Sequence, residues 1–143
     1  MTMLMCPTDC CTLSNYLAIR TTAIDLDWTV TFPTKPSTPG TISGTAKHTL
    51  LAVDTVDRVI FDTSHLKIHK IVAGKDQLKY TLAHRTEPYG SALTIHFPKK
   101  LEKDETTEVT IDYETTDSCT AVQWLIPEQT FGGKYPFMYS MHY

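Results

Sequence analysis

The sequence lacks a long apolar run, has few glycines and carries no excess of positive charge. Its 143 residues include 13 lysine and arginine residues against 16 aspartate and glutamate residues, which gives a formal net charge of -3. A chain without a positive field releases few counterions from nucleic acid, so we expect no nucleic-acid partner. Because nowhere do 18 apolar residues follow one another, we expect no membrane-spanning helix and no membrane partner. Residues 1–7 also lack the features of a secretion signal, which favours a cytoplasmic or nuclear location.

Cysteine is scarce as well, and three of the four cysteines crowd near the amino terminus, at Cys6, Cys10 and Cys11. That arrangement does not suit a disulfide framework. A zinc site built on these cysteines would need a fourth ligand from far along the chain. We therefore expect no metal ligands in this chain and keep a zinc site at the three cysteines only as an alternative.

Threonine, in contrast, occurs 24 times, and it suits pleated strands better than helices. From Ile24 to Phe32, apolar residues alternate strictly with polar ones, which predicts a half-buried strand. A proline-rich loop then leads to a second extended stretch, Thr41 to Val53, so the two stretches are predicted to form a long hairpin. Within it we place Trp28 opposite the small residue Gly44 or its neighbour Ala46, which leaves room for the indole.

Short apolar stretches separated by turn residues recur along the rest of the chain. A turn at Gly74 predicts a second hairpin that continues to Leu82. No window has apolar residues at the helical period of 3.6. We therefore predict an all-β fold, with antiparallel saddle-like sheets or a sandwich of about eight strands. Residues 1–14 are predicted to be a disordered leader, and residues 15–143 a single β-domain.

Histidines and carboxylates do not form a recognisable catalytic set. His65 and His69 are four residues apart, which in a strand separates them by about 13 Å, too far for one zinc ion. We expect both, and also His96, on solvated strand faces. Asp25 and Asp27 are expected on the solvent face of the first strand, so a glycosidase pair is not supported. The residues by themselves predict no catalytic groups.

Three segments carry a more specific signal. They are DCCTLSN at 9–15, LKYTLAHRTEPYGSALTIHF at 78–97 and TAVQWLIPEQTFGGKYPFMYS at 120–140. These segments resemble the amino-terminal domain of the leukotriene A4 hydrolase family and its fungal aminopeptidase relatives, which are zinc metallopeptidases with epoxide hydrolase activity. The third segment is close to the family's run Ala-Leu-Gln-Trp-Leu-x-Pro-Glu-Gln-Thr. The resemblance implies a saddle-like β-domain that packs on a thermolysin-like catalytic domain and forms one wall of the substrate cleft.

The resemblance also implies what this chain does not contain. In the family a Gln-x-Gln element that faces the substrate follows the serine equivalent to Ser140, and here Met141 and Tyr143 stand at the two glutamine positions. These two residues are the only candidates for substrate contact. The family's zinc motif His-Glu-x-x-His and its Gly-x-Met-Glu-Asn loop would lie beyond residue 143. We therefore expect a β-domain that is incomplete at its carboxyl end, with no cofactor of its own and with zinc only in the full-length family.

Two functional hypotheses follow from this sequence. The first is a catalytically inert amino-terminal fragment whose partner is the missing catalytic domain, with a peptide substrate only in the full-length enzyme. The alternative is a stand-alone β-sandwich module that recruits proteins through its carboxyl-terminal strand. In that strand Tyr135, Phe137, Tyr139 and Tyr143 share one side. A partner domain could cover these aromatic residues, or they could close the domain's own core, and we also expect self-association through this strand.

Overall fold

The computed structural model describes residues 10–140, which form ten strands and one 3-10 helix. The strands are β1 (Ile19–Thr31), β2 (Thr41–Ala52), β3 (Val56–Thr63), β4 (Leu66–Ala73), β5 (Asp76–Gln77), β6 (Lys79–Leu82), β7 (Ser91–Leu101), β8 (Thr106–Thr115), β9 (Val122–Leu125) and β10 (Phe137–Ser140), and the helix is η1 (Pro127–Gln129). Every strand pair is antiparallel. The prediction of an all-β antiparallel fold is confirmed. Among residues 10–140, no helix is long and apolar enough to cross a membrane.

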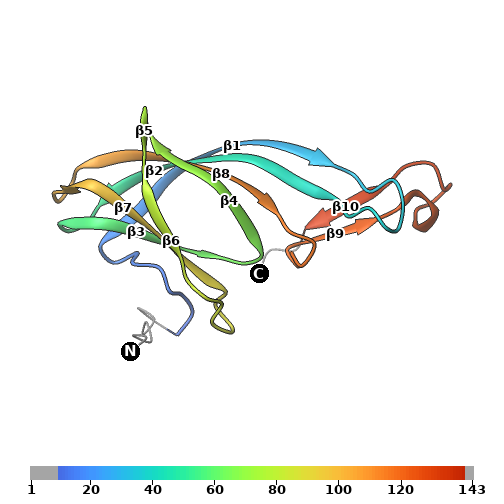
Figure 1. Cartoon of the computed structure of the whole chain (residues 1–143), viewed down its shortest axis with the longest axis horizontal. Helices are drawn as coiled ribbons and strands as arrows, with labels where there is room; N and C mark the ends of the chain where they lie inside the picture. Colours follow the sequence, from blue (N-terminus) through green and yellow to red (C-terminus); the bar gives the residue numbers. More distant parts are fainter. Residues whose placement is uncertain (1–9, 141–143) are drawn as a thin grey trace.

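The strands form three sheets. The largest has five strands in the order β1-β2-β8-β4-β5, the second has the order β3-β7-β6, and the third pairs β9 with β10. Figure 1 shows the three-stranded sheet under one end of the five-stranded sheet, and the β9–β10 pair beside the other end. The core lies between the first two sheets, where the largest fully buried side chains are Leu50, Ile71, Leu93, Ile95 and Val109. These residues come from both sheets, so they pack face to face between them, as in a sandwich.

The β1–β2 hairpin confirms the predicted pairing of Trp28 with Gly44, which lie directly opposite each other. Gly44 has a φ of 147°, a backbone conformation that favours glycine. A Cβ atom at this position would lie 2.1 Å from the carbonyl oxygen of Asp27. Glycine therefore lets the two backbones approach closely at the position opposite Trp28.

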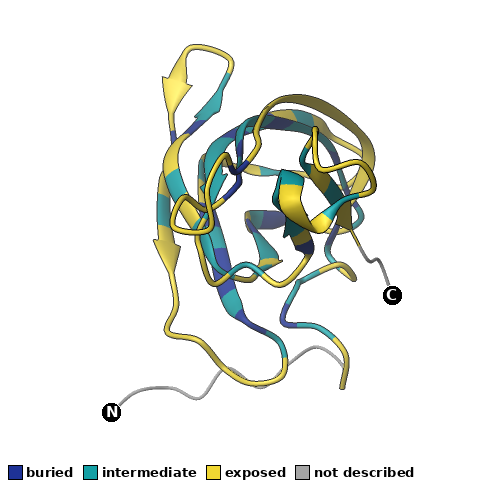
Figure 2. Ribbon diagram, turned by 90° about the vertical axis from the view of Figure 1, so that its right-hand side faces the viewer, coloured by how far each residue is buried: buried dark blue, intermediate teal, exposed yellow. Residues whose placement is uncertain are grey.

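The predicted burial of this first strand is wrong. The strand forms, but its five apolar side chains remain 36–52% exposed: Ile24, Leu26, Trp28, Val30 and Phe32, called here the β1 apolar face. In Figure 2, β1 is coloured as exposed along almost its whole length. The reason is architectural, because the β1–β2 hairpin extends past the end of the three-stranded sheet and nothing in residues 10–140 fully covers it (Figure 1).

The predicted second hairpin is much shorter than expected. β4 and β5 pair only at Val72 with Gln77 and at Ala73 with Asp76, around Gly74, whose φ is 60°. The chain then leaves this sheet and joins the other one as β6, which pairs with β7. Leu78 lies at the crossing and is buried between the sheets. Burial of this leucine favours the crossing over continued pairing with β4.

The end of the predicted leader is packed against β3. Residues 1–9 lie outside the described part of the chain, but Leu13 is 5% exposed and its backbone N–H donates to Asp62 Oδ1 at 2.9 Å. The Asn15 side chain accepts a hydrogen bond from the Ile60 N–H at 2.8 Å and donates one to the Arg58 carbonyl at 3.0 Å. Asn15 thus pairs with the outer edge of β3 much as the backbone of a neighbouring strand would.

Candidate interface surface

The two residues predicted to contact substrate cannot be placed. Met141 and Tyr143 lie outside the described residues, which end at Ser140 in β10. The strand that leads to them is described, and it pairs with β9 through Phe137 opposite Leu125 and Ser140 opposite Val122. The structure therefore describes the surface next to these two positions.

That surface carries exposed aromatic side chains on one side of β10. Tyr135, Phe137 and Tyr139, called here the β10 aromatic face, are 76%, 54% and 42% exposed. The rings of Phe137 and Tyr139 lie 6.4 Å apart. The hypothesis that these residues close the domain's own core is wrong for all three, because they point away from it. Tyr143, the fourth residue of the predicted series, lies outside the described range.

The opposite side of the β9–β10 pair holds it against the β1–β2 hairpin. The ring of Trp124 meets the ring of Phe32 edge to face, with centroids 5.7 Å apart and planes at 88°. Gly40 lies directly beneath this indole, since a Cβ atom there would be 2.2 Å from a Trp124 ring carbon. One face of the pair thus packs on the hairpin, which leaves the β10 aromatic face turned outward.

The β1 apolar face is the second exposed apolar surface, and Trp28 is its centre. Trp28, Gly44 and Tyr113 are aligned across β1, β2 and β8. The Trp28 side chain is near enough to the Tyr113 hydroxyl to affect its pKa. Burial raises the pKa of this hydroxyl, and the side chain of Trp28 opposes that shift. The surface around Trp28 is mainly apolar, because Leu26 and Val30 flank it on the same face of β1.

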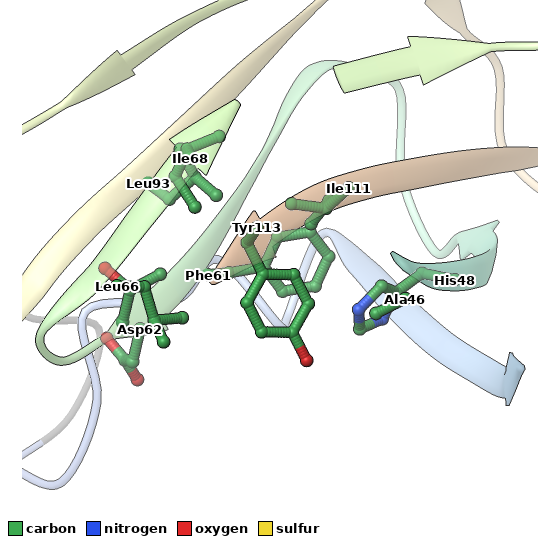
Figure 3. A pocket seen from close by; sticks show the side chains of 10 residues that line it. Ala46, His48, Phe61, Asp62, Leu66, Ile68, Leu93, Ile111 and Tyr113 are labelled. Carbon is green, nitrogen blue, oxygen red and sulfur yellow. The ribbon is translucent and has the colours of Figure 1, made fainter. Parts of the chain in front are cut away.

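A cavity of about 160 Å³ opens between the sheets beside Tyr113. Tyr113, Phe61, His48, Ala46 and Ile111 are among the side chains that line it (Figure 3). The rings of His48 and Phe61 lie 4.6 Å apart. His48 Nδ1 is buried and has no hydrogen-bond partner within residues 10–140, and burial lowers the pKa of this imidazole. The lining contains no acid and base in contact, so it suits an apolar side chain better than a reacting substrate.

The described residues do not fit the zinc that the resemblance implies. Residues 10–140 contain no group of three histidine, cysteine, aspartate or glutamate side chains placed to hold a metal ion. His69 lies 3.3 Å from Glu114, but that carboxylate also pairs with Lys67 at 2.9 Å. Cys10 and Cys11 place their sulfur atoms 3.6 Å apart, whereas Cys6 lies outside the described range. No catalytic step is therefore derived through zinc in this chain.

The other predicted solvent-facing residues behave mostly as expected. Asp25 and Asp27 are exposed, and the ammonium of Lys47 lies 3.1 Å from Asp25, which raises the pKa of that lysine. His69 and His96 are exposed on strands, as predicted. His65 is different, because it occupies the turn between β3 and β4 with a φ of 55° rather than a strand.

Sequence reasoning missed the cavity and the exposure of the β1 apolar face. The residues around the cavity come from distant strands, and His48 and Tyr113 line it together because β2 pairs with β8. One signal was present, since His48 shares the parity of the buried residues Ala46 and Leu50 in β2. That parity alone indicates a histidine on the inner face of the sheet.

Comparison with known proteins places this fold among the aminopeptidases. No protein-family model matches the chain. Leucine aminopeptidase 2 of Ajellomyces capsulatus is 38% identical over 136 residues, which are 94% of this chain and 21% of that protein. The leukotriene A-4 hydrolase homolog of Botryotinia fuckeliana is 36% identical over 135 residues, 94% of this chain and 20% of that protein.

Solved structures agree with these relatives. Yeast leukotriene A4 hydrolase in complex with bestatin superposes with a TM-score of 0.76 at 32% identity, over 90% of this chain and 19% of that one. The M1 zinc metallopeptidase of Deinococcus radiodurans shares the fold, with a TM-score of 0.57 at 18% identity over 72% of this chain and 22% of its own. The chain spans about one fifth of the length of the curated relatives it matches. We conclude that the chain corresponds, in sequence and in fold, to the amino-terminal part of the leukotriene A4 hydrolases and the fungal leucine aminopeptidase 2 proteins.

Proposed function

We propose that this chain is a non-catalytic β-domain that shapes one wall of the substrate cleft of a zinc aminopeptidase and epoxide hydrolase, whose catalytic domain is a separate part of the protein. The observation that carries the proposal is its match to the amino-terminal fifth of the leucine aminopeptidase 2 proteins. The substrate of the whole enzyme is a peptide with a free amino end. The contribution of this chain is binding geometry rather than bond chemistry.

The exposed β10 aromatic face supports this role. An isolated small domain gains little from three adjacent exposed aromatic side chains, whereas a domain interface buries them. β10 is also the strand that leads directly to Met141 and Tyr143, the positions where the family carries its substrate-facing glutamines. A catalytic domain docked along β10 would therefore bring these positions to the cleft.

The test is a chimera in which this chain replaces the matching amino-terminal fifth of yeast leukotriene A4 hydrolase. We expect the chimera to hydrolyse aminoacyl anilides, and the isolated chain to show no turnover with or without added zinc. The proposal would be contradicted if the isolated chain showed turnover and a chelator abolished that turnover. An inactive chimera that is folded and loaded with zinc would also count against it.

Matched substitutions in the chimera separate a role at the cleft from a general effect on folding. Tyr139→Ser removes an aromatic ring that is 42% exposed on β10, and Leu82→Ser removes an apolar side chain that is 43% exposed on β6. We expect Tyr139→Ser to raise KM or weaken docking of the catalytic domain, and Leu82→Ser to leave both unchanged. Equal effects of the two substitutions would contradict the proposed position of β10.

A second candidate function is a stand-alone interaction module. β10 forms the outer strand of a two-stranded sheet and carries exposed aromatic residues, which suits strand addition by another protein. Reading the transcript beyond codon 143 discriminates between the two. An in-frame His-Glu-x-x-His motif supports the enzyme domain, and a stop codon with no such motif in any spliced form supports the module.

The proposal includes a location in the cytoplasm or nucleus. Imaging of the tagged chain in its own host tests this part, and secretion of the tagged chain would contradict it.

A further inference from the structure

We propose that two copies of this chain associate through β1, whose strands pair antiparallel about a two-fold axis beside Trp28. The proposal concerns the chain by itself and does not depend on the proposed function. It differs from self-association through the carboxyl-terminal strand because the contact lies on the largest sheet.

The first observation is an unprotected edge. β1 is the outermost strand of the five-stranded sheet, so one side of its backbone has no partner strand among residues 10–140. Sheet edges are usually protected by proline, by lysine or by a bulge. β1 contains neither proline nor lysine, and its only irregularity lies between Thr21 and Ala23, near its beginning. From Ile24 to Thr31 the edge is regular and free to pair.

The second observation is that the apolar side of β1 is complementary to itself. When Trp28 lies opposite Trp28 of the second copy, Leu26 falls opposite Val30 and Ile24 falls opposite Phe32, in both directions. The residues of this face that lie within β1 then have an apolar residue of the second copy opposite them, and Phe32, which follows the strand and contacts Trp124, lies at the end of the new strand pair. These side chains are 36–52% exposed in the single chain, so the contact removes apolar surface from water.

The third observation concerns charge on the other side of the strand. In the same register Asp27 falls opposite Thr29 of the second copy, and Asp25 falls opposite Thr31. A threonine hydroxyl can donate a hydrogen bond to a carboxylate. Registers centred on Leu26 or Asp27 would instead place aspartates opposite each other, which is unfavourable. Both sides of β1 therefore favour pairing about Trp28 over those registers.

The surroundings leave room for this contact. Figure 1 shows the distal part of the β1–β2 hairpin extending past β3, β7 and β6, so the three-stranded sheet does not approach this stretch of the edge. The paired strands would join two five-stranded sheets into one continuous sheet. The occupant that fits the edge is thus a strand with the pattern of β1 itself.

Sedimentation velocity over a concentration series tests the proposal with three proteins: the wild type, Thr29→Lys and Thr29→Asp. Thr29 is exposed, so neither substitution touches the core. The lysine would lie opposite Asp27 of the second copy, and the aspartate would create a like-charge pair there. Each change occurs twice in a dimer, so we expect the dissociation constant to fall about five-fold for Thr29→Lys and to rise about five-fold for Thr29→Asp.

The same two substitutions at Thr81 are the control. Thr81 is also an exposed threonine on an outer strand, because β6 ends the three-stranded sheet. We expect the Thr81 variants to match the wild type. A monomer at every concentration overturns the proposal, as does a dimer whose dissociation constant is equal in both Thr29 variants. The proposal is also overturned if Tyr139→Lys abolishes the dimer and the Thr29 variants leave its dissociation constant unchanged. That result would place the contact at β10.

Discussion

At Gly44 the backbone of β2 passes so close to β1 that no side chain fits. A Cβ atom there would lie 2.1 Å from the Asp27 carbonyl oxygen, and the φ of 147° is itself unfavourable for other residues. We expect Gly44→Ala to lower the free energy of unfolding by about 2 kcal/mol or more, because both the contact and the backbone must adjust. Urea denaturation of the purified variant measures this loss.

Gly74→Ala is the matched control for that experiment. Gly74 also has a positive φ, 60°, but a Cβ atom there would meet nothing within 4 Å. Only the cost of a positive φ for alanine remains, so we expect the free energy of unfolding to fall by about 1 kcal/mol. Equal losses at the two glycines would show that the close approach of β1 and β2 does not matter.

His48 links the stability of the domain to pH. Burial lowers the pKa of its imidazole from the ordinary value of 6.5, so the unfolded chain binds a proton more readily than the folded chain does. The contribution of His48 to stability is complete above pH 6.5 and is lost as the pH falls from 6.5 towards the folded-state pKa. We therefore expect the free energy of unfolding to decrease on acidification through this range.

The measurement compares urea unfolding at pH 7.5 and pH 5.5. His48→Leu removes the titrating group from its site beside Phe61 and should shrink the difference between the two pH values. His84→Gln changes an exposed histidine and should leave the difference as in the wild type. A His48→Leu variant with an unchanged pH dependence would assign the effect to other groups.

At the scale of elements, the β9–β10 pair packs on the β1–β2 hairpin through Trp124. Trp124 packs over Gly40 and against Phe32. We expect Gly40→Ala to displace the indole and release the pair, because a Cβ atom would lie 2.2 Å from a ring carbon. Hydrogen exchange should then accelerate in β9 and β10 and remain slow in β7. Uniform acceleration would show that the pair is not an independent unit.

The elements themselves could largely be predicted from the sequence, but their burial could not. Alternation from Ile24 to Phe32 predicted the strand and its two faces, and the small residue Gly44 predicted the position of Trp28. Alternation, however, fixes only which side chains share a face. Whether that face is covered depends on where the three-stranded sheet ends, and this is not encoded within β1. The crossing at Leu78 was missed for a similar reason, because turn residues at Gly74 indicate a reversal but not which sheet receives the next strand.

At the scale of the whole molecule, the cavity could not be predicted from the order of residues within single strands. The cavity brings His48 of β2, Phe61 of β3 and Tyr113 of β8 together, and only the order of strands in the sheets does this. The β10 aromatic face was different, because Tyr135, Phe137 and Tyr139 are close in sequence and their shared parity was already visible. Recognising them as an outward-facing surface required the position of Trp124, which occupies the other side of the pair.

The place of β8 in the large sheet has a consequence for how the chain folds. β8 lies between β2 and β4, although more than thirty residues separate it in sequence from either. During synthesis the β1–β2 hairpin and β4 therefore remain unconnected until Thr106–Thr115 has left the ribosome, since no other strand of the described residues pairs with both. Such long-range pairing is slow to form and leaves strand edges open in the meantime. Among residues 10–140, the last strand longer than four residues is thus the one that closes the sheet.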